Sequence, residues 1–123
     1  MAPIRVLIAD DHLLFAEALE AILGGDGRFD VVGLARDGAQ AVELAAAESP
    51  DVVLMDISMP VKDGFEATQE LLEQRPETAV LMLTGSNSRS DVDRARTAGA
   101  SGYVTKDRIA SELIDAVLEV MER

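Results

Sequence analysis

The chain of 123 residues contains no cysteine. This absence excludes disulfides, thiolate metal sites and a cysteine nucleophile, so an oxidising compartment is not required. No apolar run approaches the roughly 18 residues that a membrane span needs, and the first residues lack the layout of a signal peptide. These absences predict a soluble, cytoplasmic protein that does not enter a membrane.

Positive charge is also scarce. Lysine and arginine number 11 against 23 aspartates and glutamates, which gives a formal net charge of −12. A surface of that sign repels nucleic acid and anionic membranes, so we expect no direct nucleic-acid binding by this chain. Hydrophobic residues, in contrast, make up 48% of the sequence. At this length, that content is sufficient for one compact domain over residues 1–123.

Five short apolar runs alternate with five stretches at helical spacing. The runs predict strands at 4–9, 30–35, 52–55, 79–84 and 101–104. Helices are predicted at 13–23, 39–48, 65–75 and 88–98, with a last helix near the C-terminus. Strands that are apolar throughout are covered on both faces. The pattern therefore predicts an α/β, flavodoxin-like (βα)5 three-layer sandwich with a five-stranded parallel sheet in the order 2-1-3-4-5.

Polar side chains stand at the ends of four of these strands. They are Asp10 and Asp11 after the first strand, Asp56 after the third, Thr84 at the end of the fourth and Lys106 just after the fifth. Ligands of open parallel sheets bind beyond the carboxyl ends of the strands, near the switch in strand order. Strands one, three, four and five are neighbours in the predicted order, so we expect these side chains to converge on one edge.

Three carboxylates in one place repel each other and favour a hard cation with oxygen ligands, such as Mg²⁺. Lys106 and Thr84 supply a positive charge and a hydroxyl that suit the oxygens of a phosphoryl group. A carboxylate can be the nucleophile and form an acyl phosphate, and Asp56 is the most central of the three.

Each of these residues has a plainer explanation when it is taken alone. A strand-terminal aspartate is often a turn or cap residue, Thr84 a turn hydroxyl and Lys106 a surface lysine. Their joint occurrence on adjacent strand ends favours the phosphoryl site. His12, the sole histidine, is interpreted as a partly exposed residue at a helix start rather than a ligand or phosphodonor.

Four stretches together resemble the signature of the response-regulator receiver domains, and the resemblance covers essentially the whole chain. They are residues 6–12, residues 53–60 with Asp63-Gly64, residues 81–84 and residues 99–106. The resemblance implies a phosphorylation-dependent switch of a two-component system, with a sensor histidine kinase as partner. It implies a phosphoacceptor that assists its own chemistry and is not a turnover enzyme.

By that resemblance, Asp56 is the phosphoacceptor and Lys106 contacts the phosphoryl group. The carboxylates of Asp11 and Asp56 and the backbone carbonyl of Ser58 are expected to bind Mg²⁺. Asp10 is expected to act mainly through water.

The resemblance also assigns Thr84 and Tyr103 as a switch pair, although Tyr103 alone would be an ordinary core or edge aromatic. Gly85 is expected to leave the site open to a phosphodonor. Ser58 and Ser86 shape the approach of water, and because both are small and uncharged we expect no unusually fast self-dephosphorylation.

The Asp-Asp-His run at 10–12 and the pair Lys106-Asp107 resemble the NarL/FixJ subgroup. Its members usually carry a LuxR-type helix-turn-helix domain after the receiver, so we expect a longer protein with such a domain, the alternative being a stand-alone receiver. Many receivers have proline in a cis peptide after the lysine. Asp107 takes that place here, and a cis bond is not expected because without proline it costs about 3–4 kcal/mol.

The resemblance predicts homodimerisation on phosphorylation, or control of an attached output domain, through the face of the fourth helix, fifth strand and fifth helix. Two other functions are alternatives for this sequence. A phosphatase of the haloacid-dehalogenase kind needs a second aspartate two residues after the nucleophile, where this chain has Ser58. A constitutive interaction module with the receiver fold would be expected to lack an acid or the lysine.

Overall fold

The computed structural model describes residues 2–85 and 88–122. The elements in chain order are β1 (Ile4–Ala9), α1 (Leu13–Gly24), β2 (Phe29–Ala35), α2 (Gly38–Glu48), β3 (Val52–Asp56), α3 (Gly64–Gln74), β4 (Ala79–Thr84), α4 (Arg89–Ala98), β5 (Gly102–Thr105), the 3₁₀ helix η1 (Lys106–Arg108) and α5 (Ile109–Met121). The predicted alternation is confirmed, and the predicted ends differ by at most one residue. The 3₁₀ helix η1 was not predicted.

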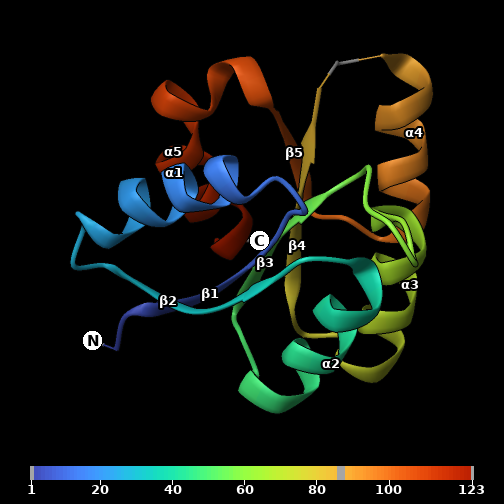
Figure 1. Ribbon diagram of the computed structural model, residues 1–123, viewed down its shortest axis with the longest axis horizontal. Coiled ribbons are helices and arrows are strands. Elements are labelled where there is room, and N and C mark those ends of the chain that lie inside the picture. The colour runs from blue at the N-terminus through green and yellow to red at the C-terminus, as the bar shows by residue number, and fades with distance from the viewer. Residues whose placement is uncertain (1, 86–87, 123) are drawn as a thin grey trace.

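All neighbouring strands of the sheet are parallel, and their order is β2-β1-β3-β4-β5. Figure 1 shows this sheet with helices on both sides. The predicted flavodoxin-like order is therefore confirmed. With this order the carboxyl ends of β1, β3, β4 and β5 lie side by side along one edge of the sheet.

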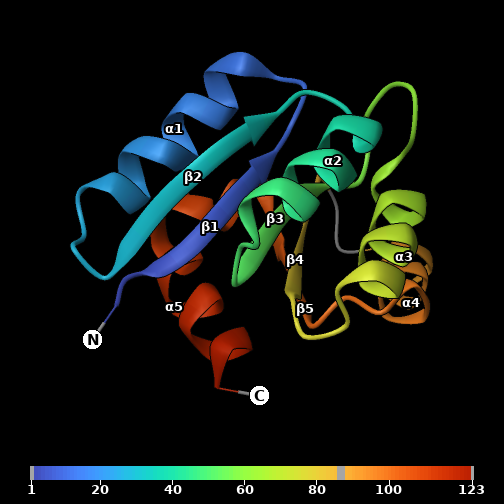
Figure 2. The ribbon, with the colours of Figure 1, turned by 90° about the horizontal axis from the view of Figure 1, so that it is seen from below.

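The two faces of the sheet carry separate hydrophobic cores. Alternate residues of a strand point to opposite faces, so Val53 and Met55 of β3 pack in one core while Val52 and Leu54 pack in the other. Helices α2, α3 and α4 cover the first face, and α1 and α5 cover the second, as the view in Figure 2 shows. Burial on both sides explains why the strands are apolar throughout.

Side-chain caps fix the starts of three helices. Ser88 accepts a hydrogen bond from the Asp91 backbone N–H at 3.2 Å and begins α4. Asp37 and Asp63 accept from the third residue beyond them and begin α2 and α3 in the same way. Gly99 ends α4 with a φ of 104°, a conformation that glycine adopts at little cost.

None of the helices within residues 2–85 and 88–122 combines the length and apolarity needed to cross a membrane.

The loop between β3 and α3 is held directly against the end of β3. The Gly64 N–H donates to the Ile57 carbonyl at 2.9 Å. A Cβ atom at Gly64 would overlap the backbone carbonyl of Asp56. Val61, at the tip of the same loop, has a φ of 69°, which is rare for a β-branched residue. Close backbone contact at Gly64 therefore helps to set the shape of this loop, together with the packing of Met59 in the core.

We expect the substitution Gly64→Ala to destabilise the fold by about 1–3 kcal/mol, because the added methyl group forces the loop away from the end of β3. Urea unfolding measures the loss. Gly24→Ala is the matched control, since a Cβ there meets nothing within 4 Å and alanine is the better helix former. Equal stabilities of the two variants would contradict the close contact at Gly64.

Candidate functional site

The side chains predicted to converge do so at the carboxyl edge of the sheet. Asp10 follows β1, Asp56 closes β3, Thr84 closes β4, and Lys106 follows β5 as the first residue of η1. Asp10, Asp56 and Thr84 are all buried, each with no more than 3% of its surface exposed. Asp11 is exposed on the solvent side of the cluster. Carboxylate oxygens of Asp10, Asp11 and Asp56 lie within 4.8 Å of one another.

A single ammonium group faces the two buried carboxylates. Lys106 Nζ lies 3.3 Å from Asp56 Oδ2 and 3.5 Å from Asp10 Oδ2. The same nitrogen is 4.7 Å from the centroid of the Phe15 ring on α1. This cation–π contact helps to hold the lysine beside the acids. Phe15 was not among the predicted site residues, because its contact with Lys106 forms only when α1 packs near η1.

Each buried carboxylate has one oxygen bound to the backbone and one that is not. Asp10 Oδ1 accepts from the His12 backbone N–H at 2.8 Å, and Asp56 Oδ1 accepts from the Ser58 N–H at 3.3 Å. The two Oδ2 atoms are buried and accept no hydrogen bond from any described residue. They instead form ion pairs with the Lys106 ammonium at 3.3 and 3.5 Å. Buried acceptors without a hydrogen bond are rare, because each costs about 1–3 kcal/mol.

The burial and the neighbouring charges shift the pKa of the Asp56 carboxyl. Burial raises the pKa of the Asp56 carboxyl, and the negative charge of Asp10 raises it further, while Lys106 acts in the opposite direction. The lysine therefore only partly compensates the acids. An excess of buried carboxylate oxygens with no thiolate nearby is a donor set that fits a hard divalent cation such as Mg²⁺.

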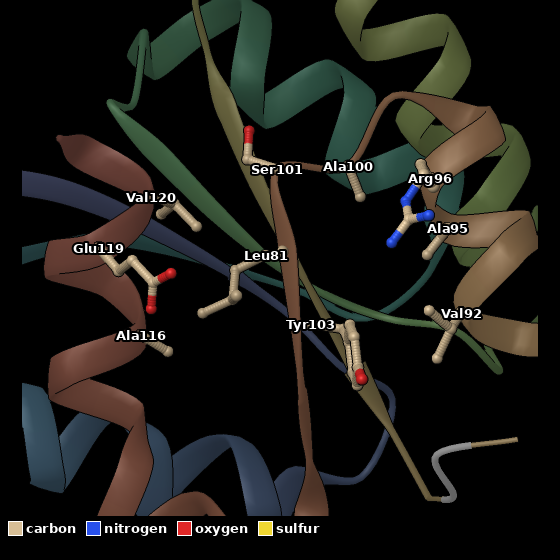
Figure 3. A pocket seen from close by; sticks show the side chains of 11 residues that line it. Leu81, Val92, Ala95, Arg96, Ala100, Ser101, Tyr103, Ala116, Glu119 and Val120 are labelled. Carbon is tan, nitrogen blue, oxygen red and sulfur yellow. The ribbon is translucent and has the colours of Figure 1, made fainter. Parts of the chain in front are cut away.

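Tyr103 lies apart from the acids, on the outer side of β5, where it is 44% exposed. It lines a cavity of about 580 Å³ between α4 and α5, together with Val92 and Arg96 of α4 and Ala116 of α5. Figure 3 shows the ring standing beside α4 at this cavity. The structure thus does not bring Tyr103 into the acidic cluster, but it gives the ring an open space next to β5.

The remaining predicted residues surround the opening of the site. Gly85 directly follows β4, is exposed, and has open space where a side chain would begin. Ser58 is exposed in the loop after β3. Ser86 lies outside the described residues. The peptide between Lys106 and Asp107 is trans, as expected.

His12 is also close to the acids. Its ring is 66% exposed, as expected of a boundary residue, but Nδ1 lies 3.3 Å from Asp10 Oδ1 and 3.2 Å from Asp11 Oδ1. The same atom is 3.9 Å from Asp56 Oδ2. The ring is therefore part of the cluster. The signal in the sequence was its place directly after two aspartates at a strand end.

This arrangement of acids, threonine and lysine on a 2-1-3-4-5 sheet agrees with the comparison to known families. The model of the response regulator receiver domain matches residues 6–118. The chain belongs to this family. Receiver domains are the phosphorylation-dependent switches of two-component systems; they partner with sensor histidine kinases and generally bind Mg²⁺ at their acidic pocket.

Individual relatives agree with the family. The receiver is 43% identical over 119 residues to the transcriptional regulatory protein DegU of Brevibacillus brevis, a match covering 97% of this chain and 50% of DegU. The signal receiver domain of NarL from Mycobacterium tuberculosis superposes with a TM-score of 0.94 at 36% identity, covering 99% of this chain and 98% of that one. The chain spans about half the length of the curated relatives that it matches.

A second solved structure is a chain of the CheX–CheY complex with BeF₃ and Mg²⁺ from Borrelia burgdorferi. It superposes with a TM-score of 0.90 at 27% identity and covers 96% of this receiver and 89% of its own length. The receiver fold is thus shared with this chain at 27% sequence identity.

We expect Asp56→Asn to stabilise the receiver by about 1–3 kcal/mol at neutral pH in the presence of EDTA, because it removes a buried charge with an unsatisfied oxygen. The raised pKa of the Asp56 carboxyl determines how this difference in stability varies with pH. The folded wild type holds the Asp56 proton more tightly than the unfolded chain does, so its stability falls as pH rises from the ordinary aspartate pKa through the raised one. The amide introduced by Asp56→Asn does not titrate, and the gain should vanish in acid.

Urea unfolding of both proteins across this pH range measures the effect. Asp30→Asn is the matched control, since Asp30 is exposed on β2 and its change should stay within about 0.5 kcal/mol. A variant Asp56→Asn no more stable than wild type at neutral pH would show that Lys106 already neutralises the cluster.

Proposed function

We propose that this receiver accepts a phosphoryl group on Asp56 from a sensor histidine kinase and changes its output surface as a result. The observation that carries the proposal is the Asp56 Oδ2 atom. It is buried, accepts no hydrogen bond from the described residues, and lies 3.3 Å from the Lys106 ammonium. An oxygen with free lone pairs beside a fixed positive charge is suited to attack phosphorus.

In the transfer, a carboxylate oxygen of Asp56 forms a bond to phosphorus as the bond to the donor breaks. The donor is a phosphohistidine of the kinase or a small acyl phosphate, and the product is a mixed anhydride on Asp56. Lys106 contacts the phosphoryl oxygens and balances their charge. Thr84, at the end of the neighbouring strand, donates its hydroxyl hydrogen to the same oxygens.

Mg²⁺ is the cofactor that we assign to the acidic cluster. The carboxylates of Asp11 and Asp56 and the backbone carbonyl of Ser58 would hold the ion, with Asp10 acting through water. When bound, Mg²⁺ supplies positive charge that offsets the carboxylates and the incoming phosphoryl oxygens. The orphaned oxygens of Asp10 and Asp56 support this assignment, as does the presence of Mg²⁺ and BeF₃ in the similar CheX–CheY complex.

The switch connects Asp56 to the far side of β5. When Thr84 turns toward the phosphoryl group, it vacates space beneath β5, and the Tyr103 ring turns inward from its exposed position. The cavity beside Tyr103 is lined by both α4 and α5, so an inward ring reshapes the face that α4, β5 and α5 form. Phosphorylation thereby biases a two-state equilibrium of this surface.

The output of that surface is a homodimer or an attached DNA-binding domain. The chain spans about half the length of relatives such as DegU, which is named as a transcriptional regulatory protein. We assign residues 1–123 as the receiver of a longer regulator with a helix-turn-helix output domain. The net charge of −12 leaves DNA contact to that domain. We expect no unusually fast self-dephosphorylation, because Ser58 and Ser86 offer no acid or amide to orient water.

Intact-mass measurement after incubation with acetyl phosphate tests the proposal. We expect one added phosphoryl group in the presence of Mg²⁺ and none in EDTA. Asp56→Asn should abolish the addition, whereas Asp30→Asn should leave it unchanged.

If the folded wild type gains no phosphoryl group, binding of beryllofluoride with Mg²⁺ is measured next. Failure of both would contradict the switch and favour the alternative, a constitutive and phosphorylation-independent interaction module with the receiver fold.

A further inference from the structure

The imidazole of His12 stands among the carboxylates in a position that the proposed magnesium site does not use. His12 is the residue before α1, and its side chain does not cap the helix. Its backbone N–H is bound to Asp10 Oδ1 at 2.8 Å, which fixes the start of the side chain next to the cluster. The ring nitrogen Nδ1 faces the Asp10 carboxylate at 3.3 Å and takes no part in capping the helix.

The donor atoms around the ring have the spacing of ligands to one ion. Atoms bound at about 2.0–2.2 Å to one metal lie about 3 Å apart when adjacent and about 4 Å apart when opposite. His12 Nδ1 lies 3.3 Å from Asp10 Oδ1, 3.2 Å from Asp11 Oδ1 and 3.9 Å from Asp56 Oδ2. All four residues offer an atom within 4.8 Å of the others.

A second observation points independently to a ligand at this place. Asp10 and Asp56 are 2% and 3% exposed, and each directs a buried oxygen without a hydrogen-bond partner among the described residues into the cluster. One of these two oxygens, Asp56 Oδ2, lies 3.9 Å from His12 Nδ1. A cation would satisfy these oxygens and the imidazole together.

We propose that His12 Nδ1 is a metal ligand and makes this site prefer a transition-metal ion, such as Mn²⁺ or Ni²⁺, over Mg²⁺. The inference rests on the proposed cation site and adds a nitrogen donor to it. Mg²⁺ prefers oxygen donors and retains its waters, whereas imidazole suits the transition ions and affinity rises from Mn²⁺ to Ni²⁺. Nδ1 must be unprotonated to bind, which leaves the ring proton on Nε2.

Pulsed EPR of Mn²⁺ bound to the untagged receiver tests the assignment directly. His12 is the sole histidine of the chain, so an imidazole ¹⁴N coupling to Mn²⁺ identifies it without ambiguity. We expect this coupling in the wild type and its loss in His12→Asn. Asparagine is among the preferred residues at the position before a helix, so the variant keeps the fold.

Calorimetric titrations with Ni²⁺ and Mg²⁺ give the selectivity. We expect His12→Asn to weaken Ni²⁺ binding by about tenfold or more, a loss typical for removal of a group that supports a metal, and to leave Mg²⁺ binding within about twofold. Asp56→Asn should weaken both ions, which places them in the same site.

Mn²⁺ bound without nitrogen coupling, or an unchanged preference for Ni²⁺ in His12→Asn, would overturn the role of His12 and leave the proposed magnesium site standing. Failure of the wild type to bind any of the three ions would overturn both proposals.

Discussion

Two buried carboxylates share one ammonium at the carboxyl edge of the sheet, and the chemistry of the receiver depends on that imbalance. Lys106 lies within 3.5 Å of both Asp10 and Asp56, yet neither Oδ2 atom accepts a hydrogen bond from the described residues. The cluster therefore has unused acceptors and excess negative charge. In the proposed function a cation relieves that excess, and a phosphoryl group then adds to it, so ion binding and phosphorylation depend on each other.

The fold keeps these groups in place although they repel each other. Every residue of β3 is buried, and one hydrophobic core packs against each face of the sheet. The hydrophobic burial that fixes β3 is far larger than the cost of a few unsatisfied oxygens. Beyond the strand, Gly64 brings the loop against the Asp56 backbone. The acid thus has little freedom to move away from Lys106, and the site is preorganised.

Much of the fold was predictable, because its signals are local. Runs such as 52–55 are apolar at every position, which only burial on both faces explains, and the parallel order followed from the five-fold alternation. The convergence of Asp10, Asp56 and Lys106 was predictable for the same reason, since strand ends of a known order share an edge. The roles of these residues in phosphoryl transfer remain predictions.

Other features depend on tertiary packing and had no sufficient signal in the sequence. The contact of Phe15 with Lys106 exists only where α1 meets η1, and the short η1 helix itself was missed. His12 was predicted to be an exposed residue at a helix start, and its ring is exposed. The ring also lies 3.2 Å from Asp11, a distance that cannot be read from the sequence. Val61 has a positive φ in the folded loop, a conformation that β-branched residues rarely adopt. Its residue type therefore gave no sign of this conformation.

The titration of the Asp56 carboxyl carbon by ¹³C NMR, in the absence of divalent ions, tests the charge imbalance most directly. The account predicts a midpoint above the ordinary aspartate range, because burial and Asp10 raise the pKa more than Lys106 lowers it. It also predicts that Mg²⁺ shifts the midpoint downward, since the ion binds the charged form. A midpoint at or below the ordinary value without metal would contradict the account and show that Lys106 alone satisfies the site.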